Sequence, residues 1–148
     1  MCLRYSANRQ DAEDILQDGF LKIYRDMHQY KPEAPFGAWA RKVMVNTSLE
    51  HIRKMNRRPK SNGQEIRPYD SVSRTDPSTE MNAKDLMHFV RELPEDYRLV
   101  FNLVAIEGYS HKEVEEMLKI TVANSKVRLN RARKILQRKI ESIYQTAK

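Results

Sequence analysis

Hydrophobic residues recur at intervals of three and four along both ends of the chain, which is the spacing of amphipathic helices. At the N-terminal end, the spacing predicts one helix that stops before Pro32 and a second from about Phe36 to Arg58. Asn8, three residues before Asp11, is suited to cap the first helix by accepting from its free amides. The stripe expected to face the core comprises Ala12, Leu16, Phe20, Ile23 and Met27.

The C-terminal end predicts four helices in close succession. Gly108 ends the second of them. Ser110 and Glu113 have the spacing of a capping box at the start of the third. Thr121 is then placed to cap the last helix, expected over residues 122–144. No segment alternates like a strand, so the predicted fold class is all-α.

A polar stretch without helical period separates these blocks and contains Pro59, Pro68 and Pro77. Such a composition is typical of a linker. The chain is therefore predicted to consist of two small helical domains, residues 1–58 and 84–148, joined by a flexible linker over 59–83. Each domain carries a net charge of +4, whereas the linker carries −1. The short connection between the last two helices predicts a helix-turn-helix within the C-terminal four-helix domain.

The composition and net charge of the chain limit the classes of function that it can have. The net charge of +7 favours a polyanionic partner, either nucleic acid or an acidic membrane surface. No apolar run approaches the roughly 20 residues of a spanning helix, so no membrane insertion is expected. Cys2 is the only cysteine, which fits a reducing cytoplasm. Four scattered histidines and four glycines give no metal or phosphate-loop motif, so we expect no metal, no cofactor and no enzymatic activity.

The last helix has the most informative charge pattern. Residues 119–140 include eight basic side chains and no acidic one. Helical geometry places an inward stripe at Val122, Ser125, Leu129, Ala132 and Leu136. The outward side chains are then Asn124, Val127, Arg128, Arg131 and Lys134. A solvated basic face is the ordinary alternative, but the capping box, tight turn and single-sign run together favour DNA contact.

The first helix has the opposite character. Asp14, Gln17 and Asp18 surround Leu21, an apolar residue on the side opposite the expected core stripe. An exposed leucine within an acidic patch suits docking on a basic protein. Acidic residues also favour the first turn of a helix, and single exposed leucines are common. The residues alone leave both interpretations open.

The second helix combines aromatic and basic residues. Tyr30, Phe36 and Trp39 precede a series of cations that ends with Arg53, Lys54, Arg57 and Arg58. Aromatic side chains can stack on unpaired bases while the cations follow the backbone. Trp39 is expected to belong to the core instead, and Asn46 is either a buried hydrogen-bonding residue or a base reader.

Several segments, in their order along the chain, resemble the extracytoplasmic-function sigma factors of bacterial RNA polymerase. These segments are DAEDILQDGF (11–20), FGAWARKVMVN (36–46), LPEDYRLVF (93–101) and GYSHKEVEEML with NSKVRLNRARKIL (108–136). The resemblance implies an initiation factor that gives core polymerase its promoter specificity, with an anti-sigma factor as a further possible partner. That family usually has an additional helix before the segment that matches Leu3, so the resemblance leads us to expect that the given sequence lacks this helix. Ser125 stands where that family often has an inward-facing valine. Val127 stands where the family usually has an outward-facing polar residue.

The resemblance also implies roles for residues. Asp14, Gln17, Asp18 and Leu21 would dock on the polymerase. The minus-ten element would be read and opened by Tyr30, Phe36, Asn46, Arg53, Arg57 and Arg58. The minus-thirty-five element would be read by Asn124, Val127, Arg128, Arg131 and Lys134.

Two other classes of protein are alternatives to this interpretation. The alternative is a stand-alone helix-turn-helix regulator that binds palindromic duplex DNA as a dimer. A nuclease would need carboxylates that converge on metal ions. The acidic residues Asp11, Glu13, Asp14 and Asp18 instead span several faces of one helix.

Overall fold

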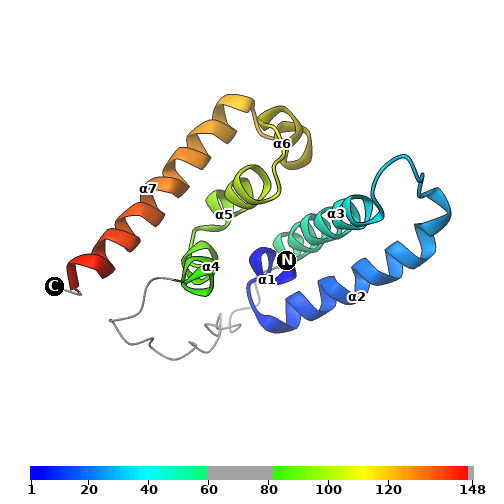
Figure 1. Ribbon diagram of the computed structural model, residues 1–148, viewed down its shortest axis with the longest axis horizontal. Coiled ribbons are helices and arrows are strands. Elements are labelled where there is room, and N and C mark those ends of the chain that lie inside the picture. Colours follow the sequence, from blue (N-terminus) through cyan, green and yellow to red (C-terminus); the bar gives the residue numbers. More distant parts are fainter. Residues whose placement is uncertain (60–81, 147–148) are drawn as a thin grey trace. The chain divides into compact units, whose positions relative to one another are not determined.

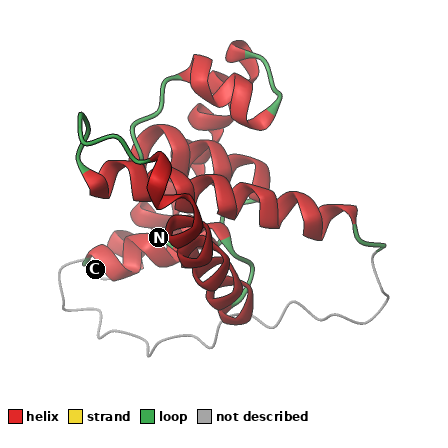
Figure 2. Cartoon of the chain, turned by 90° about the vertical axis from the view of Figure 1, so that its right-hand side faces the viewer, coloured by secondary structure: helices red, strands yellow, loops and turns green. Residues whose placement is uncertain are grey.

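A computed structural model describes residues 1–59 and 82–146 of the chain, and every regular element in these ranges is helical (Figure 2). The all-α prediction is therefore confirmed. The chain divides into two compact units, Met1–Val72 and Ser73–Lys148. Most of the predicted linker, residues 59–83, lies outside the described residues.

The N-terminal unit is built on two long helices, preceded by one short helix and joined by a 3-10 turn and a loop (Figure 1). Its elements are α1 (Cys2–Tyr5), α2 (Arg9–Asp26), the 3-10 turn η1 (Met27–Gln29) and α3 (Phe36–Arg57). The predicted cap of α2 is confirmed, because the Asn8 side chain accepts a hydrogen bond from the Asp11 amide at 2.8 Å. Pro35 is the N-cap residue of α3, as its fixed φ and missing amide hydrogen favour.

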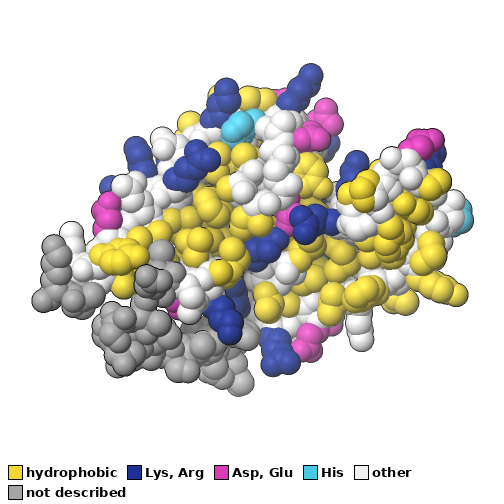
Figure 3. All heavy atoms as spheres, in the orientation of Figure 1, with side chains coloured by type: hydrophobic (Ala, Val, Ile, Leu, Met, Phe, Trp, Pro, Cys, Tyr) yellow, Lys and Arg dark blue, Asp and Glu magenta, His cyan; other side chains and the backbone are white. Residues whose placement is uncertain are grey.

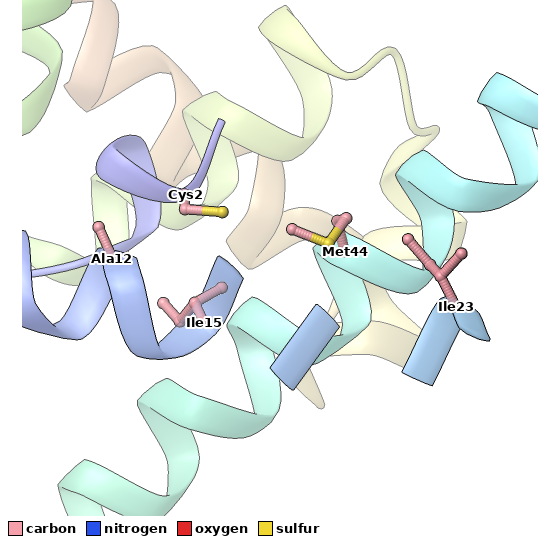
Figure 4. Packing of buried hydrophobic residues seen from close by; sticks show 5 residues of the cluster. All are labelled: Cys2, Ala12, Ile15, Ile23 and Met44. Carbon is pink, nitrogen blue, oxygen red and sulfur yellow. The ribbon is translucent and has the colours of Figure 1, made fainter. Parts of the chain in front are cut away.

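The core of this unit lies where α1, α2 and α3 meet. Its buried cluster comprises Cys2, Ala12, Ile15, Ile23 and Met44 (Figure 4). Gly19 is also buried and allows close approach of α3, since a Cβ built on Gly19 would lie 2.1 Å from the Met44 sulfur. Burial in the core raises the pKa of the Cys2 thiol above its ordinary value.

The predicted core stripe of the first helix is wrong in part. Ala12 and Ile23 are buried, but Leu16, Phe20 and Met27 are 42%, 60% and 48% exposed. The row that packs on α3 contains Ala12, Ile15, Gly19 and Ile23. Gly19 in this row leaves space that the Met44 side chain of α3 occupies. Hydrophobic side chains consequently remain on the surface formed by α2 (Figure 3).

The C-terminal unit contains the four predicted helices. They are α4 (Ala83–Arg91), α5 (Glu95–Phe101) continued by a π-helical segment, η2 (Asn102–Ile106), then α6 (His111–Leu118) and α7 (Val122–Thr146). Gly108 follows η2 with a φ of 83°, a conformation that glycine adopts without strain. Asn82 and Asp85 form a capping box at α4 that the sequence analysis did not identify.

The core of the C-terminal unit joins α4 and the α4–α5 turn to α7. Val90, Leu93, Ala132 and Leu136 form its buried cluster. Arg98 is buried beside it and donates a hydrogen bond from Nη1 to the Arg91 carbonyl at 3.0 Å, near the end of α4. Loss of hydration lowers the pKa of this guanidinium from its ordinary value. Within the ranges described, no helix combines the length and apolarity needed to span a membrane.

The close approach at Gly19 gives a stability prediction. Gly19→Ala should destabilise the N-terminal unit by about 1 kcal/mol, because overpacking against Met44 exceeds the gain in helix propensity. Gly37→Ala is the matched control: it lies near the start of α3 with no atom within 4 Å of its added Cβ. The control should be neutral or stabilising by up to about 1 kcal/mol. Trp39, the only tryptophan, packs against this core, so its fluorescence during urea denaturation reports on this unit. Equal stabilisation by both substitutions would contradict the close-packing argument.

Candidate nucleic-acid and protein interfaces

Side-chain caps at the starts of α6 and α7, and a three-residue turn between the two helices, define their geometry. The Ser110 hydroxyl accepts from the Glu113 amide at 3.2 Å, and the Glu113 carboxylate accepts from the Ser110 amide at 2.8 Å. Lys119 adopts the left-handed conformation, with a φ of 57°, and ends α6. The Thr121 hydroxyl accepts from the Asn124 amide at 3.1 Å at the start of α7. The predicted capping box, tight turn and second cap are all present.

Two further hydrogen bonds join α6 to α7 across the turn. His111 Nδ1 lies 2.8 Å from the buried Ser125 Oγ. Glu115 Oε1 accepts from the Val122 amide at 3.3 Å. Ser125 is therefore a polar residue within the inward stripe whose hydroxyl has a partner, which offsets the cost of its burial. These contacts fix the angle between the two helices.

Four of the five residues of the predicted inward stripe of α7 are buried, whereas Val122, at the start of the helix, is half-buried. Ser125, Leu129, Ala132 and Leu136 are buried. On the opposite face, Asn124, Val127, Arg131 and Lys134 are exposed. Dark-blue basic side chains project along the edge that α7 forms in Figure 3.

Arg128 does not point outward as predicted. Only 22% of its side chain is exposed, and its Nη1 lies 3.4 Å from Asp96 Oδ1 on α5. The reason is geometric: Arg128 adjoins Leu129 and lies three residues after Ser125, at the flank of the buried stripe. Asn130, which the sequence analysis missed, is exposed instead. It follows Val127 by three residues and precedes Lys134 by four, so helical spacing alone could have placed it on the exposed face.

The predicted docking residues share one face of α2. Asp14, Gln17, Asp18 and Leu21 follow the spacing of consecutive helical turns and are all exposed, Leu21 by 67%. Three of them also line a hollow of about 270 Å³ between α2 and α3. The hollow is completed from α3 and its C-terminal end by His51, Lys54, Met55 and Arg58. Acidic residues of α2 and basic residues of α3 therefore line one depression, which was not predicted from the sequence.

The aromatic residues before and within α3 pack against one another. Tyr30 and Phe36 meet edge to face with ring centroids 5.3 Å apart, and both contact Trp39 at 5.8 and 5.7 Å. The Tyr30 hydroxyl donates to the Ala34 carbonyl at 2.7 Å, which closes the loop before α3. Trp39 packs against the core, as expected. Phe36 remains exposed at the edge of this aromatic cluster.

The remaining candidates of the minus-ten group lie along α3 and at its C-terminal end. Asn46 is exposed, so the alternative that it is a buried hydrogen-bonding residue is wrong. Arg53, Arg57 and Arg58 are exposed near the end of α3. In the described part of the chain, no group of three or more histidine, cysteine, aspartate or glutamate side chains is arranged to hold a metal ion.

Comparisons with known proteins agree with this arrangement. A family model described as Sigma-70 region 2 matches residues 1–58, and one described as Sigma-70, region 4 matches residues 83–136. The "ECF RNA polymerase sigma-E factor" of Haemophilus influenzae is 27% identical over 92% of this chain and 78% of its own length. The "RNA polymerase sigma-H factor" of Pseudomonas aeruginosa is 23% identical over 99% of this chain and 82% of its own.

Two solved structures share the fold. The sigma factor RpoE of Bartonella quintana, solved in complex with the anti-sigma factor NepR, has a TM-score of 0.65 and 21% identity, covering 95% of this chain and 87% of its own. CnrH, solved with the cytosolic domain of CnrY, has a TM-score of 0.53 and 21% identity over 95% of this chain and 78% of its own.

The fold, the helix-turn-helix and the two family matches define an RNA polymerase sigma factor, a protein of transcription initiation. Within this class, the chain belongs to the extracytoplasmic-function group of the sigma-70 family.

The buried contact between α6 and α7 can be tested by removing one hydroxyl. Ser125→Ala should lower the stability of the C-terminal unit by about 1–3 kcal/mol, because it leaves the His111 ring nitrogen without this partner. Ser142→Ala, an exposed position near the end of α7, should change stability by less than about 0.5 kcal/mol. Helix loss in urea, followed by circular dichroism, measures the effect, while Trp39 fluorescence should keep its transition. An unchanged dichroism midpoint in Ser125→Ala would show that the hydrogen bond is not stabilising.

Proposed function

We propose that this sigma factor docks on core RNA polymerase through α2, reads and opens the minus-ten element through α3, and reads the minus-thirty-five element through α7. In this proposal residues 1–58 form the domain that binds polymerase and the minus-ten element, and residues 84–148 form the domain that binds the minus-thirty-five element. The protein acts in the cytoplasm and catalyses no reaction itself. The observation that carries the proposal is the exposed acidic face of α2, with Leu21 within it, in a chain that also holds a cationic helix-turn-helix.

Docking through α2 is supported by charge and exposure. Asp14 and Asp18 lie one turn apart with Gln17 between them, and Leu21 continues the same face. A basic partner would gain from both carboxylates, while burial of Leu21 would add apolar area at the centre of the contact. A stand-alone regulator has no evident need for such a face.

Opening of DNA through α3 is supported by the aromatic cluster. Phe36 is exposed but held by Tyr30 and Trp39, so it offers a fixed surface for stacking with an unpaired base. Asn46 presents an amide that can form paired hydrogen bonds with a base edge. Arg53, Arg57 and Arg58 supply cations for the backbone near the end of the same helix. Capture of unstacked bases would offset an unstacking cost of a few kcal/mol per step.

Reading of duplex DNA through α7 is supported by the helix-turn-helix geometry. The second helix of this motif enters the major groove with its N-terminal residues toward the base edges. Asn124 and Val127 lie in the first turns of α7 and can contact adenine and a thymine methyl group. Arg131 and Lys134 follow on the same exposed face, and Arg128 lies at its flank.

An anti-sigma factor is proposed as a further partner. The support is the likeness of fold to the sigma factor RpoE of Bartonella quintana, whose structure was solved in complex with the anti-sigma factor NepR. The alternative to the whole proposal remains a regulator that binds palindromic duplex DNA as a dimer. The acidic face of α2 and the aromatic cluster favour the sigma function.

Measurement of binding to core RNA polymerase distinguishes the sigma factor from the stand-alone regulator. In fluorescence anisotropy, the chain should bind bacterial core RNA polymerase with sub-micromolar affinity. The pair Asp14→Lys and Asp18→Lys should weaken binding by at least about tenfold, since like charges brought together cost several kcal/mol.

Glu13→Lys is the matched control for this test. It reverses an exposed charge that pairs with Arg9 on the same helix, at the flank of the docking face one turn before Gln17, and should weaken binding less than the Asp14 and Asp18 pair. Absence of polymerase binding, together with dimeric binding to duplex DNA, would favour the regulator instead.

Contact of α7 with DNA predicts a change in salt dependence. In the holoenzyme, Arg131→Ala and Lys134→Ala should each weaken promoter binding, and each lost phosphate contact should reduce the slope of log affinity against log salt by about 0.9. Lys84→Ala removes an exposed cation from α4 and should leave the slope unchanged. An equal effect of all three substitutions would indicate general attraction by charge rather than contact through α7.

A further inference from the structure

The first turn of α5 contacts two candidate DNA-binding arginines of α7. Asp96 Oδ1 lies 3.4 Å from Arg128 Nη1, and Arg131 Nη1 donates a hydrogen bond to the Tyr97 hydroxyl at 3.3 Å. Asp96 and Tyr97 are adjacent in sequence, while the two arginines are three residues apart on neighbouring turns. One short segment therefore holds both guanidinium groups.

We propose that Asp96 and Tyr97 are positioning residues that orient Arg128 and Arg131 for recognition of the minus-thirty-five element. The inference rests on the proposed contact of α7 with promoter DNA. It extends the recognition surface to α5, a helix outside the two that form the helix-turn-helix.

Tyr97 is suited to this role because its ring is fixed. The ring packs against the buried cluster of the C-terminal unit, whereas Arg131 is exposed. The core thus holds the hydroxyl in one place, and the hydroxyl restricts a long side chain that would otherwise sample many rotamers. An arginine oriented before binding loses less conformational entropy when it contacts a base. Orientation matters for arginine in particular, because its planar donors match a guanine edge in two parallel hydrogen bonds.

Asp96 acts on Arg128 by charge. Two thirds of the Asp96 side chain is exposed, at 66%, whereas Arg128 is 22% exposed. The carboxylate therefore draws the guanidinium toward α5 and compensates its charge in the free protein. A compensated cation attracts DNA of any sequence less strongly, which favours binding that depends on base contacts over binding that depends on charge.

Stability alone does not account for these contacts. Val90, Leu93, Ala132 and Leu136 already join α7 to the preceding elements through a buried cluster. An ion pair with an exposed partner adds little to stability. Glu92, at the C-cap of α4, makes another ion pair with α7, to Lys139. Lys139 is not among the candidate DNA contacts, so this pair provides a matched control from the same turn region.

The test compares Tyr97→Phe, Asp96→Asn and Glu92→Gln in the holoenzyme with core polymerase. The probe is a promoter duplex that the wild-type holoenzyme selects from random sequences, with the same duplex scrambled at its upstream element as the reference. The ratio of the two affinities measures specificity.

We expect Tyr97→Phe to lower this ratio of affinities by about threefold to tenfold. Asp96→Asn should lower the ratio as well, mainly by strengthening binding to the scrambled duplex. Glu92→Gln should leave the ratio within about twofold of the wild type, as expected for an exposed ion pair. Thermal unfolding by circular dichroism should be unchanged in Asp96→Asn, whose side chain is largely exposed.

A double-mutant cycle separates the inference from the function on which it rests. If Tyr97 acts through Arg131, Tyr97→Phe should have no further effect in an Arg131→Ala background. If Arg131→Ala weakens promoter binding but Tyr97→Phe and Asp96→Asn leave the ratio unchanged, the positioning role is overturned and the DNA-binding surface stands. If Arg131→Ala has no effect either, the proposed contact of α7 with DNA falls together with the inference.

Discussion

The burial of one narrow face of α7 is the constraint that orients the candidate minus-thirty-five surface. Ser125, Leu129, Ala132 and Leu136 lie against the rest of the C-terminal unit, and helical geometry then places every other residue of α7 relative to them. Ser125 and Ala132 are small, which allows close packing against neighbouring helices. The hydrogen bond between Ser125 and His111 fixes α7 relative to α6. The exposed basic face is a consequence of this burial, because no residue on it needs to contribute to the core.

On α2 as well, the burial of one face decides which residues are exposed, but here hydrophobic side chains remain on the surface. Apolar side chains lie on more than one row of this helix, but α3 packs on only one of these rows, in which Ala12 and Gly19 provide the space. The neighbouring row, which includes Leu16 and Phe20, remains exposed. The acidic face with Leu21 follows next around the helix. The choice between two possible core rows therefore decides which residues α2 presents to partners.

Local signals explain why so much of the fold could be predicted from the sequence. The caps at Asn8, Ser110 and Thr121 involve residues three apart, and the stripe of α7 involves one helix only. Contacts between distant residues were missed, since no local pattern encodes them. Arg131 and Tyr97 are separated by 34 residues, and the hollow between α2 and α3 depends on how two helices cross. Arg128 was misplaced for the same reason, because its environment is set by Asp96 on another helix.

Charge compensation within each unit bears on how the protein achieves specificity. The net charge of +7 would by itself attract any nucleic acid, and such attraction strengthens binding to every sequence equally. In the C-terminal unit, however, Asp96 faces Arg128. In the N-terminal unit, Asp14 and Asp18 share a hollow with Lys54 and Arg58. Both arrangements lower the attraction that free cations would exert, so binding depends more on base contacts. If polymerase engages the carboxylates of α2, the cations of α3 lose part of that compensation, which physically links docking to DNA binding.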